Sequence, residues 1–214
     1  MNTADQLADA ARSMLGPGIS CAVVPLGQGN LLPAEAKSMR NAVTARRDEF
    51  ASGRLALRLA IARAGYDLPA DLPILSRADR QPDLPTGLVV SLAHAGGLAI
   101  ALASCQPGIG LGVDIEPVHA MRPEGLEDSV QPFRFRDSHP DPLAVFCAKE
   151  TLFKRQFPVT GRMLDFCEVS LAMDAARFAA CIPDLGLMRG KWARISGFYL
   201  SVSAGNTCKN RHPS

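Results

Sequence analysis

Two carboxylates near the middle of the chain are spaced so that they could share one cation. Asp114 and Glu116 belong to segment 110–117, which is typical of a strand. Successive side chains of a strand point to opposite faces, so both carboxylates share a face with Gly110 and Gly112, which leave room for a ligand or another backbone. The Cα atoms of the two acids would lie roughly 6–7 Å apart, which suits one hard cation. The solvated face of an edge strand has the same pattern.

A second charged pair lies on a predicted helix over 143–157. Glu150 and Lys154 are i,i+4 neighbours in the favourable order. A carboxylate beside a fixed ammonium suits phosphate chemistry, because the acid can bind a metal or take a proton while the ammonium meets phosphate oxygens. An ordinary surface ion pair has the same spacing.

Basic groups gather in the first half of the chain. Arg47, Arg54 and Arg58 fall within about 40° of one another on a predicted helix. Residues 35–63 hold six arginines and one lysine against three acidic residues, a net charge of +4. Such a cluster favours an anionic partner, although arginines that extend outward from a core helix would give the same pattern. His94, at a strand-to-turn junction, could donate to a phosphate oxygen or serve a structural purpose.

Together these segments resemble the 4′-phosphopantetheinyl transferase superfamily, in its longer, Sfp-like and enterobactin-type branch. The specific part is Gly-Val-Asp-Ile-Glu followed by Lys-Glu-x-x-x-Lys. The segments that carry the resemblance, in the family's order, are Arg46-Arg-Asp-Glu-Phe-Ala-Ser-Gly-Arg54, Arg80-Gln-Pro82, Ser91-x-x-His94, Gly112-Val-Asp-Ile-Glu116 and Phe146-Cys-Ala-Lys-Glu-Thr-Leu-Phe-Lys154.

The resemblance implies that the protein transfers the phosphopantetheine arm of coenzyme A (CoA) to a serine of an apo acyl, peptidyl or aryl carrier protein and releases 3′,5′-ADP. It implies Asp114, Glu116 and Glu150 as ligands of Mg²⁺, and Glu150, Lys154 and Asp114 as the catalytic residues. Glu150 would accept the serine proton, and Lys154 would contact the phosphates. The CoA-binding residues that it implies are Arg47, Arg54, Arg58, Arg80, Ser91, His94 and Lys154.

Two departures from the family pattern support an alternative. Ala93 and Ala95 stand where family members usually place serines beside the histidine, and the segment 117–148 is short and proline-rich. The alternative is a catalytically weak module on the same fold that binds CoA or a carrier protein.

The surrounding sequence predicts the elements that position these residues. Apolar periodicity and turn residues predict helices over 4–15, 43–64 and 143–157, with a further helix start at 32–35. Strands are expected at 20–25, 87–92, 98–103, 109–116, 167–173, 176–182 and 191–204, the last with a turn at Ser196-Gly197. Residues 66–87 are expected to form a loop with a brief strand near 74–75, and residues 117–140 a mobile loop.

This order predicts an α+β fold of two similar α/β lobes, each a long helix packed on a small antiparallel sheet. Residues 1–106 would form the lobe that binds the CoA nucleotide, and residues 107–214 the metal-binding and catalytic lobe.

Composition limits the class of protein. The 214 residues carry 23 Lys and Arg against 21 Asp and Glu, which excludes nucleic-acid binding through bulk charge. Six cysteines with no Cys-x-x-Cys pair exclude a zinc finger and favour free thiols. No signal peptide and no apolar run long enough to span a membrane is apparent. We therefore expect a cytoplasmic protein with no nucleic-acid or membrane partner, and the resemblance implies a monomer.

Overall fold

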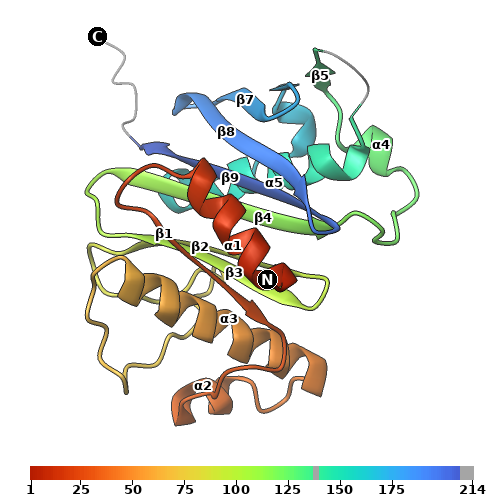
Figure 1. The fold of residues 1–214 in the computed structure, drawn as a ribbon. Coiled ribbons are helices and arrows are strands. Elements are labelled where there is room, and N and C mark those ends of the chain that lie inside the picture. The colour runs from red at the N-terminus through yellow and green to blue at the C-terminus, as the bar shows by residue number, and fades with distance from the viewer. Residues whose placement is uncertain (137–139, 208–214) are drawn as a thin grey trace.

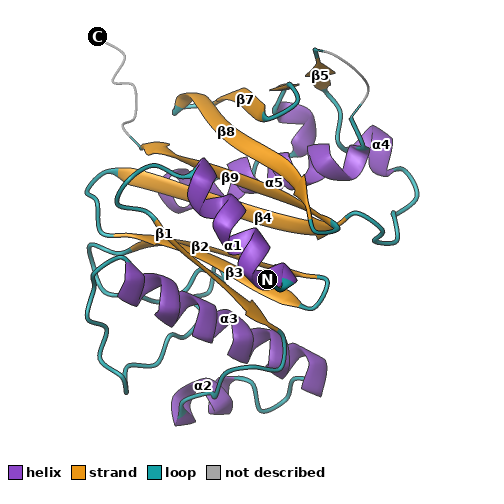
Figure 2. Ribbon diagram, in the orientation of Figure 1, coloured by secondary structure: helices purple, strands orange, loops and turns teal. Residues whose placement is uncertain are grey.

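The chain builds two β-sheets with helices packed on them (Figures 1 and 2). The computed structural model describes residues 1–136 and 140–207. The first half contains α1 (Thr3–Met14), β1 (Ser20–Pro25), α2 (Pro33–Ser38), α3 (Thr44–Arg63), β2 (Val89–Ala95) and β3 (Leu98–Ser104). The second half contains β4 (Ile109–Pro117), α4 (Leu126–Ser129), β5 (Phe133–Phe135), α5 (Pro142–Thr160), a 3₁₀ turn (Phe166–Glu168), β6 (Leu171–Met173), β7 (Arg177–Ile182), β8 (Gly186–Ile195) and β9 (Phe198–Asn206).

The two sheets differ in size. Among the described residues, one sheet has three strands in the order β1-β3-β2 and the other has six in the order β4-β9-β8-β7-β6-β5. All neighbouring strands are antiparallel except β5 and β6. The predicted mixture of α and β structure is confirmed, but the second sheet is twice as wide as the first.

Three local predictions are wrong. The strand expected from 167 begins only at Leu171, because Asp165 and Glu168 form a capping box that winds the chain into a 3₁₀ turn. The loop expected at 117–140 contains α4 and β5, while its residues 137–139 lie outside the described residues. In place of a strand near 74–75, a single bridge joins Ser76 to Pro82.

The turn predicted at Ser196-Gly197 is confirmed. It joins β8 to β9, and both residues have positive φ, 50° and 81°. Two successive positive φ values are what a tight two-residue hairpin turn requires.

A common core joins the two sheets across the predicted boundary at 106/107. Leu7 and Ala11 of α1 are fully buried there, together with Ile100 of β3 and Val113 of β4. The two sheets also meet directly, because β2 lies against β4. Each fully buried aliphatic side chain stabilises the fold by about 1.5–3 kcal/mol, so this core holds the halves in one arrangement.

Small side chains allow α3 to lie close to the first sheet. Ala99, Ala101 and Ala103 alternate along β3 and face the core that α3 fills, whereas Ile100 and Leu102 face the core under α1. Figure 1 shows α3 across the face of this sheet opposite to α1.

The helix α5 lies directly on β4 and β9, and the glycines of β4 make this possible. A Cβ atom on Gly112 would lie 2.0 Å from the carbonyl oxygen of Thr151 in α5, and one on Gly110 would meet the side chain of Arg155. Asp141 caps the start of α5 by accepting a hydrogen bond from the Leu143 amide at 3.0 Å, and Gly161 ends the helix with φ of 65°. The space beside the glycines is therefore filled by another backbone.

Two further expectations concern cysteines and membranes. The five described cysteines are free thiols, and Cys208 lies outside the described residues. Within the described part of the chain, no helix is both long enough and apolar enough to cross a membrane.

We expect Gly112→Ala to lower the free energy of unfolding by roughly 3 kcal/mol, because a methyl group cannot share space with a backbone oxygen of α5. Urea unfolding followed by circular dichroism measures the loss. The control is Gly16→Ala, since a Cβ atom there has no neighbour within 4 Å. Equal stability of the two variants would contradict the close packing of α5 on β4.

Candidate active site

A buried ion pair joins the two charged motifs. Lys154 Nζ of α5 donates to Asp114 Oδ1 of β4 at 2.6 Å, and the two side chains are 26% and 7% exposed. Burial opposes the charge of Lys154, but the adjacent Asp114 carboxylate outweighs it and raises the pKa of Lys154 above its usual value. The lysine therefore stays an ammonium, and the packing of α5 on the glycine face of β4 fixes it beside Asp114.

Two more carboxylates lie close enough to influence this pair. Burial, reinforced by the Asp114 and Glu150 carboxylates, raises the pKa of Glu116 to about 7. Burial also raises the pKa of Glu150, against the pull of Lys154. The carboxylates of Asp114 and Glu116 on β4 and of Glu150 on α5 therefore influence one another across the contact between strand and helix.

The donor set fits a hard divalent cation. Asp114 Oδ2 is buried and accepts no hydrogen bond from the described residues. In the described part of the chain, no group of three or more His, Cys, Asp or Glu side chains is arranged so that it could hold a metal ion by itself. Mg²⁺ does not need one, because it binds through one or two carboxylates and completes its shell with water and substrate oxygens. An unpartnered carboxylate oxygen beside further acidic groups is such a partial ligand set.

A cavity of about 870 Å³ opens beside Lys154. Its walls come from α3, β2, α5 and the loop that precedes β2, so both halves of the chain contribute to it. Five side chains on the walls are cationic and two are acidic: Arg46, Arg54, Arg77, Arg80 and Lys154 against Glu49 and Asp79. This excess of positive charge suits a ligand that carries phosphate groups.

One wall of the cavity is apolar. Phe153 and Phe157, one turn apart on α5, stack with their ring centroids 5.3 Å apart, and Met163 beyond them is 73% exposed. Leu84 and Leu88 of the loop before β2 line the cavity as well. The cavity can therefore contact uncharged parts of a ligand and its anionic parts at once.

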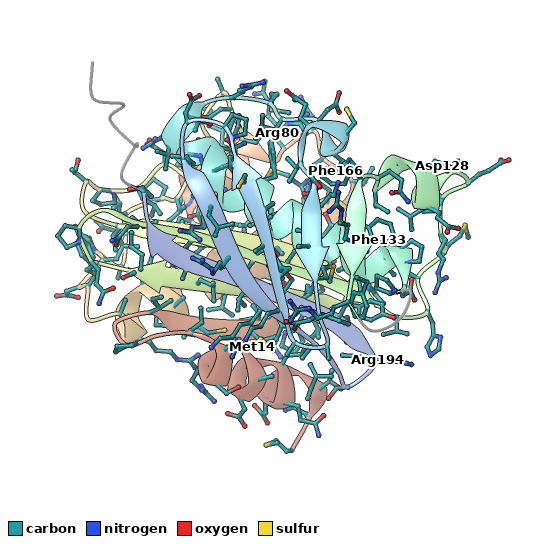
Figure 3. All side chains as sticks on the ribbon, turned by 90° about the horizontal axis from the view of Figure 1, so that it is seen from above. Met14, Arg80, Asp128, Phe133, Phe166 and Arg194 are labelled. Atoms are coloured by element: carbon teal, nitrogen blue, oxygen red, sulfur yellow. The ribbon has the colours of Figure 1, made fainter. Side chains whose placement is uncertain are left out.

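Five of the predicted CoA-binding residues line this cavity, in two ways. Arg80, labelled in Figure 3, His94 and Lys154 present exposed or partly exposed side chains. Arg54 is buried over the Phe50 ring and donates to the carbonyl of Ile74 and to Ser76 Oγ at 3.0 Å. Arg54 therefore holds the loop that forms the cavity.

Ser91 lines the cavity but already has a structural partner. Its side chain is buried, and its Oγ accepts a hydrogen bond of 3.0 Å from the Val113 amide. Since β4 is an edge strand of its sheet, the Val113 amide has no partner strand on this side. The Ser91 hydroxyl accepts its hydrogen bond instead and so links β2 to β4.

Arg47 and Arg58 are not among the described residues that line the cavity. Arg47 donates to the carbonyls of Met39 and Arg40, and Arg58 pairs with Glu35 at 2.5 Å. Glu35 is fully buried and also accepts from the amides of Leu32 and Ile74. Of the three arginines that the helical projection grouped on one face, Arg54 is buried, Arg58 is partly buried and Arg47 is exposed, and all three donate to groups of the protein itself.

Sequence reasoning missed Arg46, Arg77 and Glu49 on the cavity wall. Arg46 and Glu49 belong to the motif at residues 46–54 and lie one and two positions from Arg47. The motif therefore identified the correct region but not the residues that face the cavity. No sequence signal marked Arg77, which pairs with Asp83 at 3.0 Å.

Comparison with known proteins gives one consistent family. Residues 34–104 match the model of the 4′-phosphopantetheinyl transferase N-terminal domain. The chain is 34% identical to the 4′-phosphopantetheinyl transferase Svp of Streptomyces mobaraensis over 197 residues, which span 81% of this chain and 78% of that protein. It is 30% identical to the 4′-phosphopantetheinyl transferase PptT of Mycobacterium tuberculosis over 195 residues, or 80% of this chain and 84% of that protein. Identity to the 4′-phosphopantetheinyl transferase Npt of Nocardia iowensis is 36% over 152 residues, 66% of each chain.

The chain belongs to the 4′-phosphopantetheinyl transferase family, and it is a transferase. The resemblance that the sequence motifs indicated is thereby confirmed.

We expect Ser91→Ala to lower the free energy of unfolding by about 1–3 kcal/mol, because it leaves the Val113 amide without its acceptor at the junction of the sheets. Thermal unfolding measures the effect. Ser13→Ala, on the exposed side of α1, serves as the control and is expected to change stability by less than about 0.5 kcal/mol. Equal melting temperatures for both variants would show that this hydroxyl does not stabilise the junction.

Proposed function

We propose that the protein transfers the 4′-phosphopantetheine arm of CoA to a serine hydroxyl of an apo acyl, peptidyl or aryl carrier protein. The serine oxygen forms a bond to the phosphorus that carries the pantetheine arm. The bond from this phosphorus to the bridging oxygen breaks, and 3′,5′-ADP leaves with that electron pair. The observation that carries the proposal is the buried Lys154–Asp114 pair at the edge of a cationic cavity.

Glu150 and Lys154 have the properties that this reaction needs. Burial raises the pKa of Glu150, which makes it a better proton acceptor near neutral pH, and we assign it the serine proton, directly or through a water. Lys154 stays cationic and lines the cavity, so it can contact the phosphates and offset the charge that develops on the departing 3′,5′-ADP. The protein thus contributes positioning and charge neutralisation, and no covalent intermediate is needed.

Asp114, Glu116 and Glu150 are the residues that would hold Mg²⁺. This assignment is supported by the unpartnered Asp114 Oδ2 and by the pKa of Glu116, which burial raises and which the neighbouring Asp114 and Glu150 carboxylates raise further. When bound, Mg²⁺ would supply charge neutralisation and orientation at the CoA pyrophosphate.

The cavity is the proposed site of the CoA nucleotide. Its volume of about 870 Å³ falls in the range of cofactor sites, and it joins a cationic wall to an apolar one. We assign the binding of its phosphates to Arg46, Arg80, His94 and Lys154, all of which line the cavity. Arg54 supports the site through the loop backbone, and direct contacts of Arg47, Arg58 and Ser91 with CoA stay predictions.

The division into a nucleotide-binding lobe over 1–106 and a catalytic lobe over 107–214 is also part of the proposal. It is supported by the two helix-bearing sheets and by a cavity whose walls come from both sides of the boundary. A monomer in the cytoplasm, with CoA and a carrier protein as its partners, completes the proposal.

The alternative of a weak binding module loses part of its support. Ala93 is buried in the common core, and neither Ala93 nor Ala95 is among the described residues that line the cavity. The alanines beside His94 therefore remove no cavity contact here.

We expect Asp114→Asn and Glu150→Gln each to slow transfer by at least about 100-fold, because the first weakens the metal site and the second removes the proton acceptor. Mass spectrometry of several apo carrier proteins, incubated with CoA and Mg²⁺, measures the transfer. Asp184→Asn, in an exposed turn, is the control and keeps wild-type activity. Folding is checked by circular dichroism, and near-normal rates for either site variant would contradict the assignment.

Arg46→Ala is expected to weaken CoA binding roughly tenfold, and more than Arg47→Ala, because only Arg46 lines the cavity. Isothermal calorimetry with CoA and Mg²⁺ measures both. The control is Arg12→Ala on α1, because Arg12 belongs to an exposed i,i+3 ion pair and does not line the cavity. A larger loss for Arg47→Ala would contradict the assignment of Arg46 to the CoA phosphates.

A further inference from the structure

Three polar side chains meet on the cavity wall, Arg46 and Glu49 of α3 and His94 of β2. Glu49 Oε2 accepts a hydrogen bond of 2.9 Å from Arg46 Nη1, and the same nitrogen lies 3.1 Å from His94 Nε2. Glu49 Oε2 lies 3.7 Å from His94 Nε2. The side chains are 51%, 33% and 38% exposed for Arg46, Glu49 and His94, so a ligand in the cavity can reach them.

Glu49 is an unexpected residue on a wall that suits an anion. A fixed negative charge there repels phosphate and lowers affinity unless it contributes in another way. Its contacts show what it contributes. Arg46 and Glu49 are i,i+3 neighbours on α3, so the helix backbone maintains their contact, whereas His94 comes from a strand of the sheet.

We propose that Glu49 is a positioning residue that holds Arg46 and His94 together as a clamp for a phosphate group of the ligand. This inference rests on the proposed function. One bond to Glu49 orients the guanidinium of Arg46 and leaves most of its five N–H donors for the ligand. The same carboxylate oxygen lies 3.7 Å from His94 Nε2, so Glu49 is close to both members of the clamp.

The geometry fits a Glu49 that orients Arg46 and His94 better than a Glu49 that competes with phosphate for them. Glu49 lies on the same turn of α3 as Arg46, so the helix keeps the two side chains within reach of each other with or without a ligand. Donors that are already oriented lose little side-chain freedom when the ligand binds, and this raises affinity.

The test uses Glu49→Gln, which keeps the shape of the side chain and removes its charge. We expect the affinity for 3′,5′-ADP, measured by calorimetry, to fall roughly fivefold to tenfold. In the transfer assay, KM for CoA should rise by a similar factor, while kcat and KM for the carrier protein stay unchanged. The melting temperature should not move, and Asp9→Asn, which breaks the exposed i,i+3 pair with Arg12, should leave every one of these quantities unchanged.

A double-mutant comparison separates positioning from a general charge effect. In a chain that already carries Arg46→Ala and His94→Ala, adding Glu49→Gln should cause no further loss of 3′,5′-ADP affinity. A further loss of the same size, an unchanged affinity in the single variant or a tighter one would each overturn the inference.

Failure of the proposed function gives a different result. If the wild-type protein binds 3′,5′-ADP but modifies no carrier protein, the proposed function fails and the calorimetric comparison still decides the role of Glu49. If the wild-type protein binds neither 3′,5′-ADP nor CoA, both proposals are overturned.

Discussion

The close approach of α5 to β4 is the constraint on which the candidate site depends. With Gly112 under Thr151, the helix backbone touches the strand backbone, and the next residue on the same face of β4 is Asp114. Lys154 can then reach Asp114 at 2.6 Å from a position that is mostly shielded from solvent. Larger residues in place of the glycines would lift the helix, and the acidic groups of strand and helix would separate.

Charge in this protein is divided between structural and ligand-facing roles. Arg54 donates to the loop carbonyl of Ile74. Arg58 donates to the carbonyl of Leu72 and pairs with the buried Glu35. The two arginines therefore hold the loop that forms one wall of the cavity. Burial lowers the pKa of Arg54 to about 10, yet it stays charged at neutral pH. Arg54 also lines the cavity, but the basic groups that are exposed or partly exposed there are chiefly Arg46, Arg80, His94 and Lys154. Within the segment 35–63, whose net charge is +4, some arginines therefore hold the loop, while Arg46 faces the cavity and can bind an anionic ligand.

Local patterns predicted most of the fold. The long helices, the paired strands β2 and β3, and the Ser196-Gly197 turn follow from periodicity and from residues that accept positive φ. The short β5 and β6 were harder, because three-residue strands show no alternation and are stabilised by pairing with each other and with β7. The width of the second sheet escaped prediction for the same reason.

The sequence by itself predicted the family, through the resemblance of its motifs to those of known members. It also predicted that Asp114 and Glu116 share a face of β4, because side-chain alternation in a strand is a local property. Only the tertiary structure decided which polar groups remain free for a ligand. Ser91 binds a backbone amide of β4 and Arg58 binds Glu35, while Arg46, Glu49 and His94 meet from a helix and a strand about fifty residues apart. Such partners are chosen by packing between distant segments, which neither composition nor spacing along the chain records.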